Sequence, residues 1–465
     1  MKNTTQIKLK NNFKVTFKGA PRLDVKEIKT STSVGISPLA YKFIKAKLIV
    51  KEGEAVQQGQ ALFFDKKEAQ VYFHSPVSGV IKKIVYGPQR RLDLITIDVS
   101  SDAALEFSPL KIDETNSVEF KSALLERGLW NGFSEFPFEN IPSPSTSPPA
   151  IIVPLSNSEP FQPKLSTIID DVESDIIEGL AWLKKLSDNI SVYVDADEQV
   201  NLDAISEHVK ITRVRGDFAA NGAGSFLYNM KTSAKENKAW VCQWQHLVKI
   251  TRTLNSGQYY NQILTSVGGN QMVDNQHYRV TEGAEISSII TIKDVKDRVI
   301  CGGLFSGLHI DSPQYLPLGT YALNIIDNDP KTEFLSFMQI GFKKPSFSRA
   351  YLSGMVNEAL INLKKIPVQL PFLSNIDHST ATSSALNGSH RDCVSCGFCE
   401  EVCPVDILPQ TLLRNSKVDD VEENMRMGLL DCTTCGACTY VCPSKIDLAS
   451  TFETMKNNLY KELKA

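Results

Sequence analysis

The sequence predicts a multidomain α+β protein, and three observations lead to this prediction. Short alternating runs broken by glycines fill residues 1–105 of the 465-residue chain, which is typical of a β domain. Strand-like and helix-like segments then alternate, which is typical of an α/β layer. Eight of the ten cysteines lie between residues 393 and 442, and they indicate a separate C-terminal domain.

The eight cysteines form two copies of one pattern, Cys-x-x-Cys-x-x-Cys-x-x-x-Cys-Pro. Three thiolates at this spacing can surround one corner of an iron–sulfur cube, and in two-cluster ferredoxins the fourth cysteine of each run binds the other cluster. We therefore predict two [4Fe–4S] clusters. The predicted ligands are Cys393, Cys396, Cys399 and Cys442 for cluster 1, and Cys432, Cys435, Cys438 and Cys403 for cluster 2.

Structural zinc is the main alternative, because Cys-x-x-Cys pairs also build four-cysteine zinc sites. A zinc site needs neither the third cysteine nor the Cys-Pro step, and both runs have both features, so the pattern favours iron–sulfur clusters. Gly397 and Gly436 lie where the backbone must pass close to inorganic sulfide. Disulfides are disfavoured, because the N-terminus has no signal peptide and the pattern belongs to a reducing compartment. Cys242 and Cys301 are predicted to be buried core residues.

Composition excludes several classes of function. The net charge is −3, so nothing indicates nucleic-acid binding. No stretch is long and apolar enough to span a bilayer. We therefore expect a chain that is soluble and cytoplasmic by itself, and that would work at a membrane only by docking onto integral subunits.

Residues 1–105 are predicted to form a β-sandwich like that of biotinyl and lipoyl domains. The segments Val50–Leu62 and Ser75–Ile81 carry this similarity. Lys66 and Lys67 lie where such domains carry a modified lysine, but the gap to Pro76 is a little long. A solvated turn is therefore favoured over covalent modification.

Residues 106–278 are predicted to form a Rossmann-like α/β domain without a nucleotide loop. Gly128–Phe133 holds only two glycines, at the wrong spacing for a dinucleotide fingerprint. Gly216–Ser225 follows a predicted strand and could hold an anion, although a plain loop at the domain edge is the favoured interpretation.

The last two domains are predicted from glycines and from helical periodicity. Residues 279–344 are typical of a β-grasp (SLBB-like) unit, with paired glycines after the strand-like segment Arg298–Cys301. Residues 345–465 are predicted to form an α-helical ferredoxin domain, with helices at 345–365, between the cysteine runs, and at Leu448–Leu463. His390 could tune a cluster through a hydrogen bond, but a surface histidine is favoured.

Several segments resemble the NqrA family, the A-type subunits of Na+-translocating NADH:quinone reductases, along nearly the whole chain. They are Phe13–Pro21, Gly128–Trp130, Phe136–Phe138, Gly216–Tyr228, Gln339–Phe342, Arg349–Gly354, Pro404–Pro409 and Tyr440–Lys445. NqrA proteins typically lack the cluster cysteines and carry no redox cofactor, whereas the RnfC proteins of Rnf-type complexes have two ferredoxin runs. RnfC and its complex I relative also carry a glycine-rich loop for flavin and NADH. In that region this sequence has Trp130, Asn131 and Phe133, so we expect no FMN or NADH on this chain.

The resemblance implies a peripheral electron-transfer subunit on the cytoplasmic, inner face of a membrane complex, inactive alone and without catalytic residues of its own. It would pass single electrons between a soluble donor or flavin subunit and integral-membrane subunits, with coupling to Na+ transport; quinone is a further candidate partner. Two other hypotheses stay open. The chain could be a structural docking subunit with clusters off the electron path, or the iron–sulfur subunit of a soluble flavin oxidoreductase.

Overall fold

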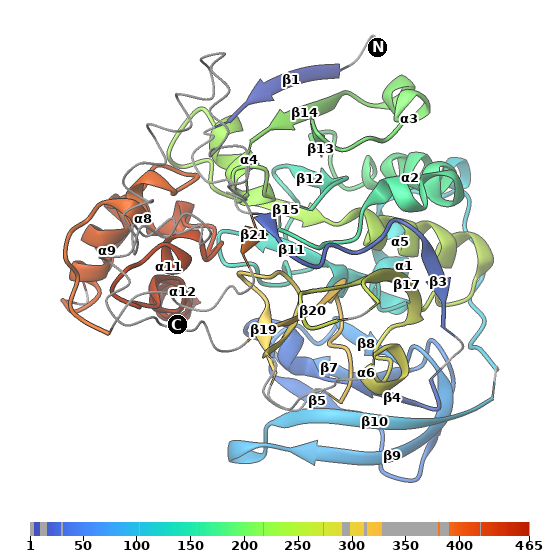
Figure 1. Cartoon of the computed structure of the whole chain (residues 1–465). Coiled ribbons are helices and arrows are strands. Elements are labelled where there is room, and N and C mark those ends of the chain that lie inside the picture. Colours follow the sequence, from blue (N-terminus) through green and yellow to red (C-terminus); the bar gives the residue numbers. More distant parts are fainter. Residues whose placement is uncertain are drawn as a thin grey trace.

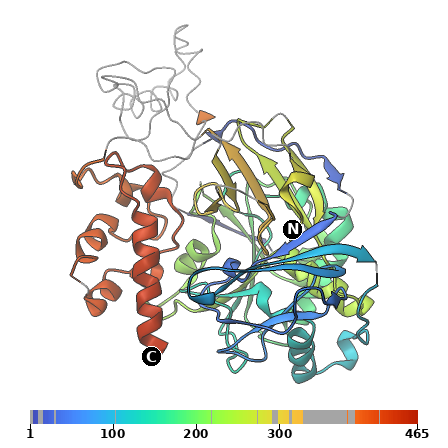
Figure 2. The same ribbon diagram turned by 90° about the horizontal axis from the view of Figure 1, so that it is seen from below.

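The computed structural model describes residues 4–9, 16–28, 31–101, 103–157, 159–216, 218–272, 274–290, 298–310, 314–327, 380–381, 390–418 and 420–464. The helix expected at 345–365 lies outside the described residues, as do the segments Gln339–Phe342 and Arg349–Gly354. The described part has a body with three main sheet regions and a helical C-terminal domain on one side of it (Figure 1). Figure 2 shows the long helix α12 on the side of this domain that faces the body.

The predicted β-sandwich is present, and two sheets form it. One sheet has the order β4-β10-β9-β6, with β4 at Ser33–Ile36, β10 at Leu92–Ser101, β9 at Ser78–Tyr86 and β6 at Ala55–Val56. The other has the order β5-β7-β8, with β5 at Ala46–Leu48, β7 at Ala61–Asp65 and β8 at Tyr72–His74. Phe63 and Phe73 stack in its core with ring centroids 4.5 Å apart. Alternation along each strand directs these apolar residues inward.

The N-terminal segment differs from the expectation that residues 1–105 form one sandwich. Strand β1 (Thr4–Lys8) pairs in parallel with β14, β2 (Thr16–Phe17) with β21 (Thr380–Ala381), and β3 (Val25–Glu27) with β17. Each strand therefore joins a different sheet of the body. Alternation within a short segment predicts a strand, but it does not identify the partner strand.

The predicted α/β layer is a six-stranded sheet with the order β1-β14-β13-β12-β15-β11. Its strands after β1 are β14 (Ile211–Arg215), β13 (Ile190–Asp195), β12 (Ile151–Pro154), β15 (Ala239–Cys242) and β11 (Phe133–Phe136). All neighbours pair in parallel except β11 with β15. The chain proceeds from β12 outward to β14 and then returns to the other side of β12 as β15, so the strand order reverses beside β12.

Helices cover this sheet because their apolar faces match it. They are α1 (Ser117–Glu126), α2 (Ile169–Leu183), α3 (Asp203–His208), α4 (Ala223–Met230) and α5 (Trp244–Ser256). Helix α1 starts with a capping box between Asn116 and Glu119, which satisfies two free backbone donors. Helical spacing in the sequence places Val118 on one side with Ala123 and Leu124. The last two are buried, but Val118 is 78% exposed, because it lies in the first turn.

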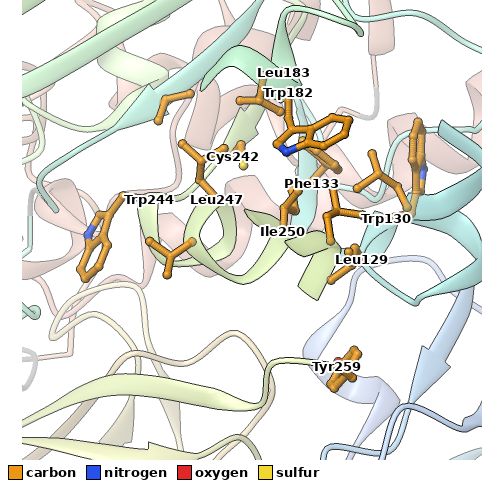
Figure 3. Close-up of a cluster of buried hydrophobic side chains, with 14 of the residues drawn as sticks. Leu129, Trp130, Phe133, Trp182, Leu183, Cys242, Trp244, Leu247, Ile250 and Tyr259 are labelled. Atoms are coloured by element: carbon orange, nitrogen blue, oxygen red, sulfur yellow. The ribbon is translucent and has the colours of Figure 1, made fainter. Parts of the chain in front are cut away.

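Trp130 and Phe133 belong to the core of the α/β domain (Figure 3). Both are 1% exposed, and the Trp130 indole donates a hydrogen bond to the Pro142 carbonyl oxygen at 2.8 Å. Cys242 lies in the same core and Cys301 in that of the third sheet, as predicted. The bulky side chains of Trp130 and Phe133 thus have a packing role.

The third sheet has the order β19-β18-β20-β16-β17-β3. Its strands are β16 (Gln262–Gly268), β17 (Gln276–Thr281), β18 (Arg298–Cys301), β19 (Leu308–His309) and β20 (Ala322–Ile326), with helix α6 (Ile286–Ile289) after β17. The sheet starts at Gln262, earlier than the expected boundary at 278, because β16 pairs with β17 and β20 rather than with the α/β sheet.

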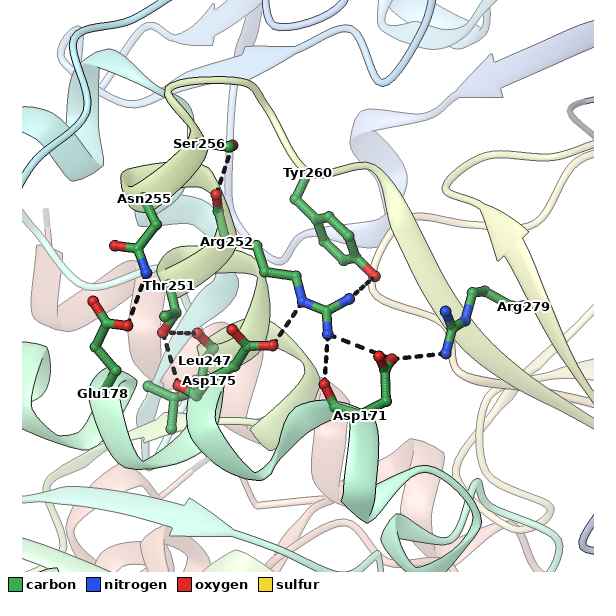
Figure 4. Close-up of polar contacts among 10 residues, drawn as sticks. All are labelled: Asp171, Asp175, Glu178, Leu247, Thr251, Arg252, Asn255, Ser256, Tyr260 and Arg279. Carbon is green, nitrogen blue, oxygen red and sulfur yellow. Dashed lines mark hydrogen bonds and ion pairs between the residues drawn. The ribbon is translucent and has the colours of Figure 1, made fainter.

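A polar network joins the third sheet to the α/β domain (Figure 4). Arg252 of α5 donates to Asp175 of α2 at 2.7 Å and to the Tyr260 hydroxyl at 3.0 Å. Arg279 of β17 donates to Asp171 of α2 at 2.9 Å. Charge-assisted bonds of this kind fix the orientation of one element against another.

The C-terminal domain is helical, as predicted. Its helices are α8 (Phe398–Glu401), α9 (Pro409–Asn415), α10 (Val421–Arg426), α11 (Ala437–Tyr440) and α12 (Leu448–Lys464). Leu412, Leu429 and Phe452 are buried in a core separate from those of the body. Helical spacing in the sequence places Leu408 on one face with Leu412, and Met425 on one face with Leu429. Leu408 and Met425 are nevertheless 43% and 36% exposed. Leu408 precedes the first turn of α9, where helical periodicity no longer applies.

Candidate iron–sulfur site

The two cysteine runs share an unusual backbone conformation. Ser395 and Thr434 have φ values of +54° and +48°, and Gly397 and Gly436 have +81° and +77°. L-residues such as serine and threonine rarely adopt this left-handed region, and doing so costs free energy. The same strained positions in both runs indicate one loop design used twice.

The repetition continues beyond the loops. Each loop leads into a one-turn helix, α8 or α11, and then to its Cys-Pro step. Two residues after each of these prolines, Asp406 and Lys445 have φ values of +50° and +51°. A further helix follows, which is α9 in the first copy and the much longer α12 in the second.

Each predicted set of four cysteines lines a small cavity of its own. We call Cys393, Cys396, Cys399 and Cys442 the outer quartet, and Cys403, Cys432, Cys435 and Cys438 the inner quartet. The fourth cysteine of each run crosses to the cavity of the other run, as the spacing predicts. Within the described ranges, no three Cys, His, Asp or Glu side chains converge on one metal ion. Four thiols around a cavity are the donor set that a [4Fe–4S] cluster takes, so the residues present fit the group.

The two quartets differ in exposure. Cys393 and Cys396 of the outer quartet are exposed, whereas Cys403 and Cys432 of the inner quartet are buried and Cys435 is only partly accessible. The outer quartet therefore lies at the protein surface, and the inner quartet lies against the body. His390, next to the outer run, is exposed, as the favoured interpretation predicted.

Burial changes the acidity of the cysteines. Burial and, secondarily, neighbouring thiols raise the pKa of Cys399 to about 11. Burial raises the pKa of Cys435 to about 12, and that of Cys438 goes well above its usual range for the same reason. Without a bound group these thiols are protonated at neutral pH. Binding of a metal group must therefore release their protons.

The outer quartet is supported from within its own domain. The Cys399 thiol donates to Gln410 Oε1 at 3.3 Å, and Gln410 Nε2 donates to Glu400 at 2.9 Å. Arg414 donates to the Ser395 hydroxyl at 2.8 Å. In the second repeat the position of Gln410 is occupied by Ala449, so the inner quartet has no equivalent amide there.

The inner quartet is instead supported by the body and by α12. Lys456 donates from Nζ to the Cys432 carbonyl oxygen at 2.9 Å, and Asp431 pairs with Lys231 of the α/β domain at 2.5 Å. A side chain at Gly224 would meet Thr433 Cγ2 at 2.6 Å. Gly224, in the loop predicted to be plain or anion-binding, thus lets the inner loop approach the body.

Helix α12 also binds the other domains. Lys42 of the sandwich pairs with Glu139 of the α/β domain at 2.8 Å and with Glu453 of α12 at 2.9 Å. Tyr460 stacks on Phe43 with ring centroids 3.9 Å apart. Lys66 and Lys67 are exposed as predicted, and the Lys67 ammonium lies 5.9 Å from the centre of the Tyr460 ring.

A cavity of about 610 Å³ separates the inner loop from the carboxyl end of the α/β sheet. Its lining comes from at least five segments, including the start of α4, Glu159, Gln243, Arg298 and the loop 433–436. The Gln243 Oε1 atom is buried without a hydrogen-bond partner among the described residues. Sequence reasoning missed this cavity, because segments so distant in the chain carry no shared motif. Ligands of open α/β sheets bind at this edge, beside the strand-order reversal.

Comparison with known families assigns three parts of the chain. The NqrA N-terminal barrel-sandwich hybrid domain matches residues 7–100, and the NqrA second alpha/beta domain matches residues 115–259. Both NqrA models thus match within residues 7–259. The 4Fe-4S dicluster domain matches residues 392–446, which span both quartets. The chain is therefore similar to NqrA over its body and to 4Fe-4S dicluster domains over residues 392–446.

Curated relatives agree along nearly the whole chain. The NqrA protein of the Na(+)-translocating NADH-quinone reductase from Glaesserella parasuis is 27% identical over 435 residues, which cover 91% of this chain and 92% of that protein. Its counterparts from Actinobacillus succinogenes and Haemophilus influenzae are each 26% identical, with the same coverage. The predicted resemblance to NqrA is confirmed, and these relatives are subunits of an oxidoreductase complex.

Solved structures are only distantly similar. An NAD+-reducing [NiFe]-hydrogenase in the air-oxidized state aligns with a TM-score of 0.35 and 11% identity, over 76% of this chain and 68% of that one. In the part of the chain that the structure describes, no helix has the length and apolar character to cross a membrane.

Proposed function

We propose that this NqrA relative is a peripheral electron-transfer subunit of a membrane complex of the Na+-translocating NADH-quinone reductase or Rnf type. It passes single electrons through two [4Fe–4S] clusters, held by the outer and inner quartets. The observation that carries the proposal is the pair of cavities, each lined by four cysteines with the fourth contributed by the other run. The relatives' names and the dicluster match support it.

The chain's own residues define the route. A bound cluster supplies one-electron oxidation and reduction without a proton-transfer group. Exposed Cys393 and Cys396 present the outer quartet to a docking partner. Pro404, Val405 and Phe452 line the inner cavity and exclude water from it. Cys435 of the inner quartet and the adjacent Gly436 also line the cavity of about 610 Å³. An electron that enters at the outer quartet would therefore pass through the inner quartet toward the body.

The finer parts of the proposal concern place and partners. We infer a position on the cytoplasmic, inner face of the membrane, with docking onto integral-membrane subunits and exchange of electrons with a soluble donor or flavin subunit. We likewise predict quinone as a candidate partner, and we predict that this chain binds neither FMN nor NADH. The order β19-β18-β20-β16-β17 supports a β-grasp assignment for the third sheet, and the parallel order of the second supports a Rossmann-like one.

A structural role for the clusters is the second candidate, and one observation favours it. Asp431, next to the inner quartet, also pairs with Lys231 of the body, and Thr433 lies close to Gly224 of the body. Loss of the inner cluster would then detach the domain without any role in electron flow. The third hypothesis, a soluble flavin oxidoreductase, has no specific observation in its favour.

The test uses the full chain purified without oxygen. We expect about eight iron and eight sulfide per chain, the content of two four-iron clusters, and a reducible low-temperature EPR signal. Cys301→Ala, which removes a cysteine outside both quartets, is the control and should keep the full iron content. Zinc in place of iron, or no metal, would overturn the proposal. Rapid-freeze EPR in the whole complex then separates the candidates, since a cluster off the electron path is not reduced within a turnover.

A further inference from the structure

Lys456 is a buried cation directly behind the inner quartet. Its side chain is 4% exposed, and its Nζ donates to the Cys432 carbonyl oxygen at 2.9 Å. Helix α12 sets this position, because Phe452, one turn earlier on the same face, lines the inner cavity. The ammonium group therefore lies next to the backbone of Cys432, which is a predicted ligand of the inner-quartet cluster.

Within the described ranges, Lys456 makes no ion pair. Two other interface lysines do contact carboxylates: Lys42 pairs with Glu139 and Glu453, and Lys231 pairs with Asp431. Among the described residues, the hydrogen-bond partner of Lys456 is a neutral carbonyl. Burial holds the pKa of Lys456 below its usual value, although Glu139 and the Cys432 thiol oppose this shift. A negatively charged group in the cavity would favour the ammonium form.

The first repeat offers a natural comparison. Lys417 follows Cys393 by as many residues as Lys456 follows Cys432. Helix α9 ends at Asn415, however, so Lys417 lies beyond it and is exposed. The same residue type at the same repeat position is therefore buried beside one quartet and solvated beside the other.

This difference has an electrostatic consequence. Reduction adds one electron to a cluster, and a nearby positive charge stabilises the added negative charge. The stabilisation is large where the surroundings are poorly polarisable, and it is small where water and salt screen the charge. A buried ammonium thus favours reduction of the inner cluster, whereas exposed Lys417 has little effect on the outer one.

We propose that Lys456 is a positioning residue that raises the reduction potential of the inner-quartet cluster relative to the potential it would have without this charge. This inference rests on the proposed function, since it needs a cluster in the inner quartet. It identifies a specific residue outside the cysteines that controls the driving force between the two clusters.

The test is a potentiometric titration followed by low-temperature EPR on the anaerobic full chain. Lys456→Met should disfavour reduction of the inner cluster by at least tenfold, which is a downward shift of about 59 mV for one electron, with a smaller shift of the outer cluster. Lys456→Arg keeps the charge and should restore most of the potential. Lys417→Met is the matched control and should shift neither cluster.

Each outcome decides the inference. A Lys456→Met protein with full iron content and an unchanged inner potential overturns it, as does an equal shift from Lys417→Met. Should Lys456→Met lose the inner cluster, Glu139→Gln takes its place: removal of this partly buried carboxylate should make the inner cluster easier to reduce, and an unchanged potential is contrary to the inference. Absence of clusters from the unmutated chain instead refutes the proposed function.

Discussion

The outer and inner quartets have the same loops but different surroundings. Their backbones match at Ser395 and Thr434 and again at Gly397 and Gly436. Yet the outer quartet lies at the surface with a glutamine beside it, and the inner quartet lies between α12 and the body with a lysine behind it. Ligand spacing thus determines what each loop can bind. The domain into which the loop docks determines the dielectric and charge that tune the bound group.

The largest expected effect comes from replacing one cysteine ligand in each quartet. Cys435→Ser should remove about four iron per chain and loosen the C-terminal domain from the body, because the inner loop also makes the interface. Cys396→Ser should remove a similar amount of iron and leave the domain docked. Iron analysis together with limited proteolysis measures both properties. Equal protease sensitivity of the two variants would mean that the inner quartet contributes no more than the outer quartet to docking of the C-terminal domain.

The next effect tests the inner interface without touching a ligand. Lys231→Met leaves Asp431 in a partly buried site without its partner, since their side chains are only 9% and 19% exposed. Breaking such a pair costs about 3 kcal/mol, measured as a lower free energy of unfolding of the C-terminal domain. Lys111→Met, in a pair with side chains 75% and 70% exposed, should cost at most about 0.5 kcal/mol. Similar costs for both would mean that the interface pair is not buried in solution.

A pH series should distinguish the body from the C-terminal domain. Burial lowers the pKa of His74 to about 4 and that of His246 to about 3. Below the unfolded-state value of about 6.5 the unfolded chain binds more protons than the folded chain. Body stability should therefore fall as the pH decreases from 6.5 toward 4, by up to about 1.4 kcal/mol per pH unit for each histidine.

The two parts can be followed separately in the same urea titration. All four tryptophans, Trp130, Trp182, Trp240 and Trp244, lie in the α/β domain, so their fluorescence reports on the body, while visible absorbance reports on the clusters. His246→Gln should flatten the pH dependence of the fluorescence transition, and exposed His390→Gln should not. A pH-independent fluorescence midpoint between 6.5 and 5 would contradict the burial of these histidines.

The smallest effect concerns the strained loop positions. Ser395→Gly and Thr434→Gly relieve a left-handed conformation that costs an L-residue about 1 kcal/mol, partly offset by the greater freedom of glycine in the unfolded chain. Each should change the free energy of unfolding by less than about 1 kcal/mol, and the two changes should be equal. Thermal denaturation of the apo and cluster-loaded chains measures both changes. A clear difference between them would mean that the two loops differ in energy despite their similar dihedral angles.

The sequence was sufficient for local features and insufficient for long-range ones. The spacing of cysteines predicted which four gather at each cavity, because a short loop leaves few ways to arrange them. It could not predict that Cys396 is exposed or that Lys456 is buried, since both depend on how separate segments of the folded chain pack together. Residues 1–105 were predicted to be rich in strands, but the partner of β1, more than two hundred residues away, was not predicted. The cavity beside Gln243 was missed for the same reason.

The arrangement of β1, β2 and β3 has a consequence for biosynthesis. These three strands lie within the first 28 residues, and their partners are β14, β21 and β17. During translation the N-terminal segment leaves the ribosome long before residues 211–215, 276–281 and 380–381 exist. Contacts so distant in the chain form slowly and expose unpaired edges meanwhile. The nascent N-terminus must therefore stay unpaired until at least residues 211–215 have been synthesised, and its unpaired strand edges are exposed to other chains during that time.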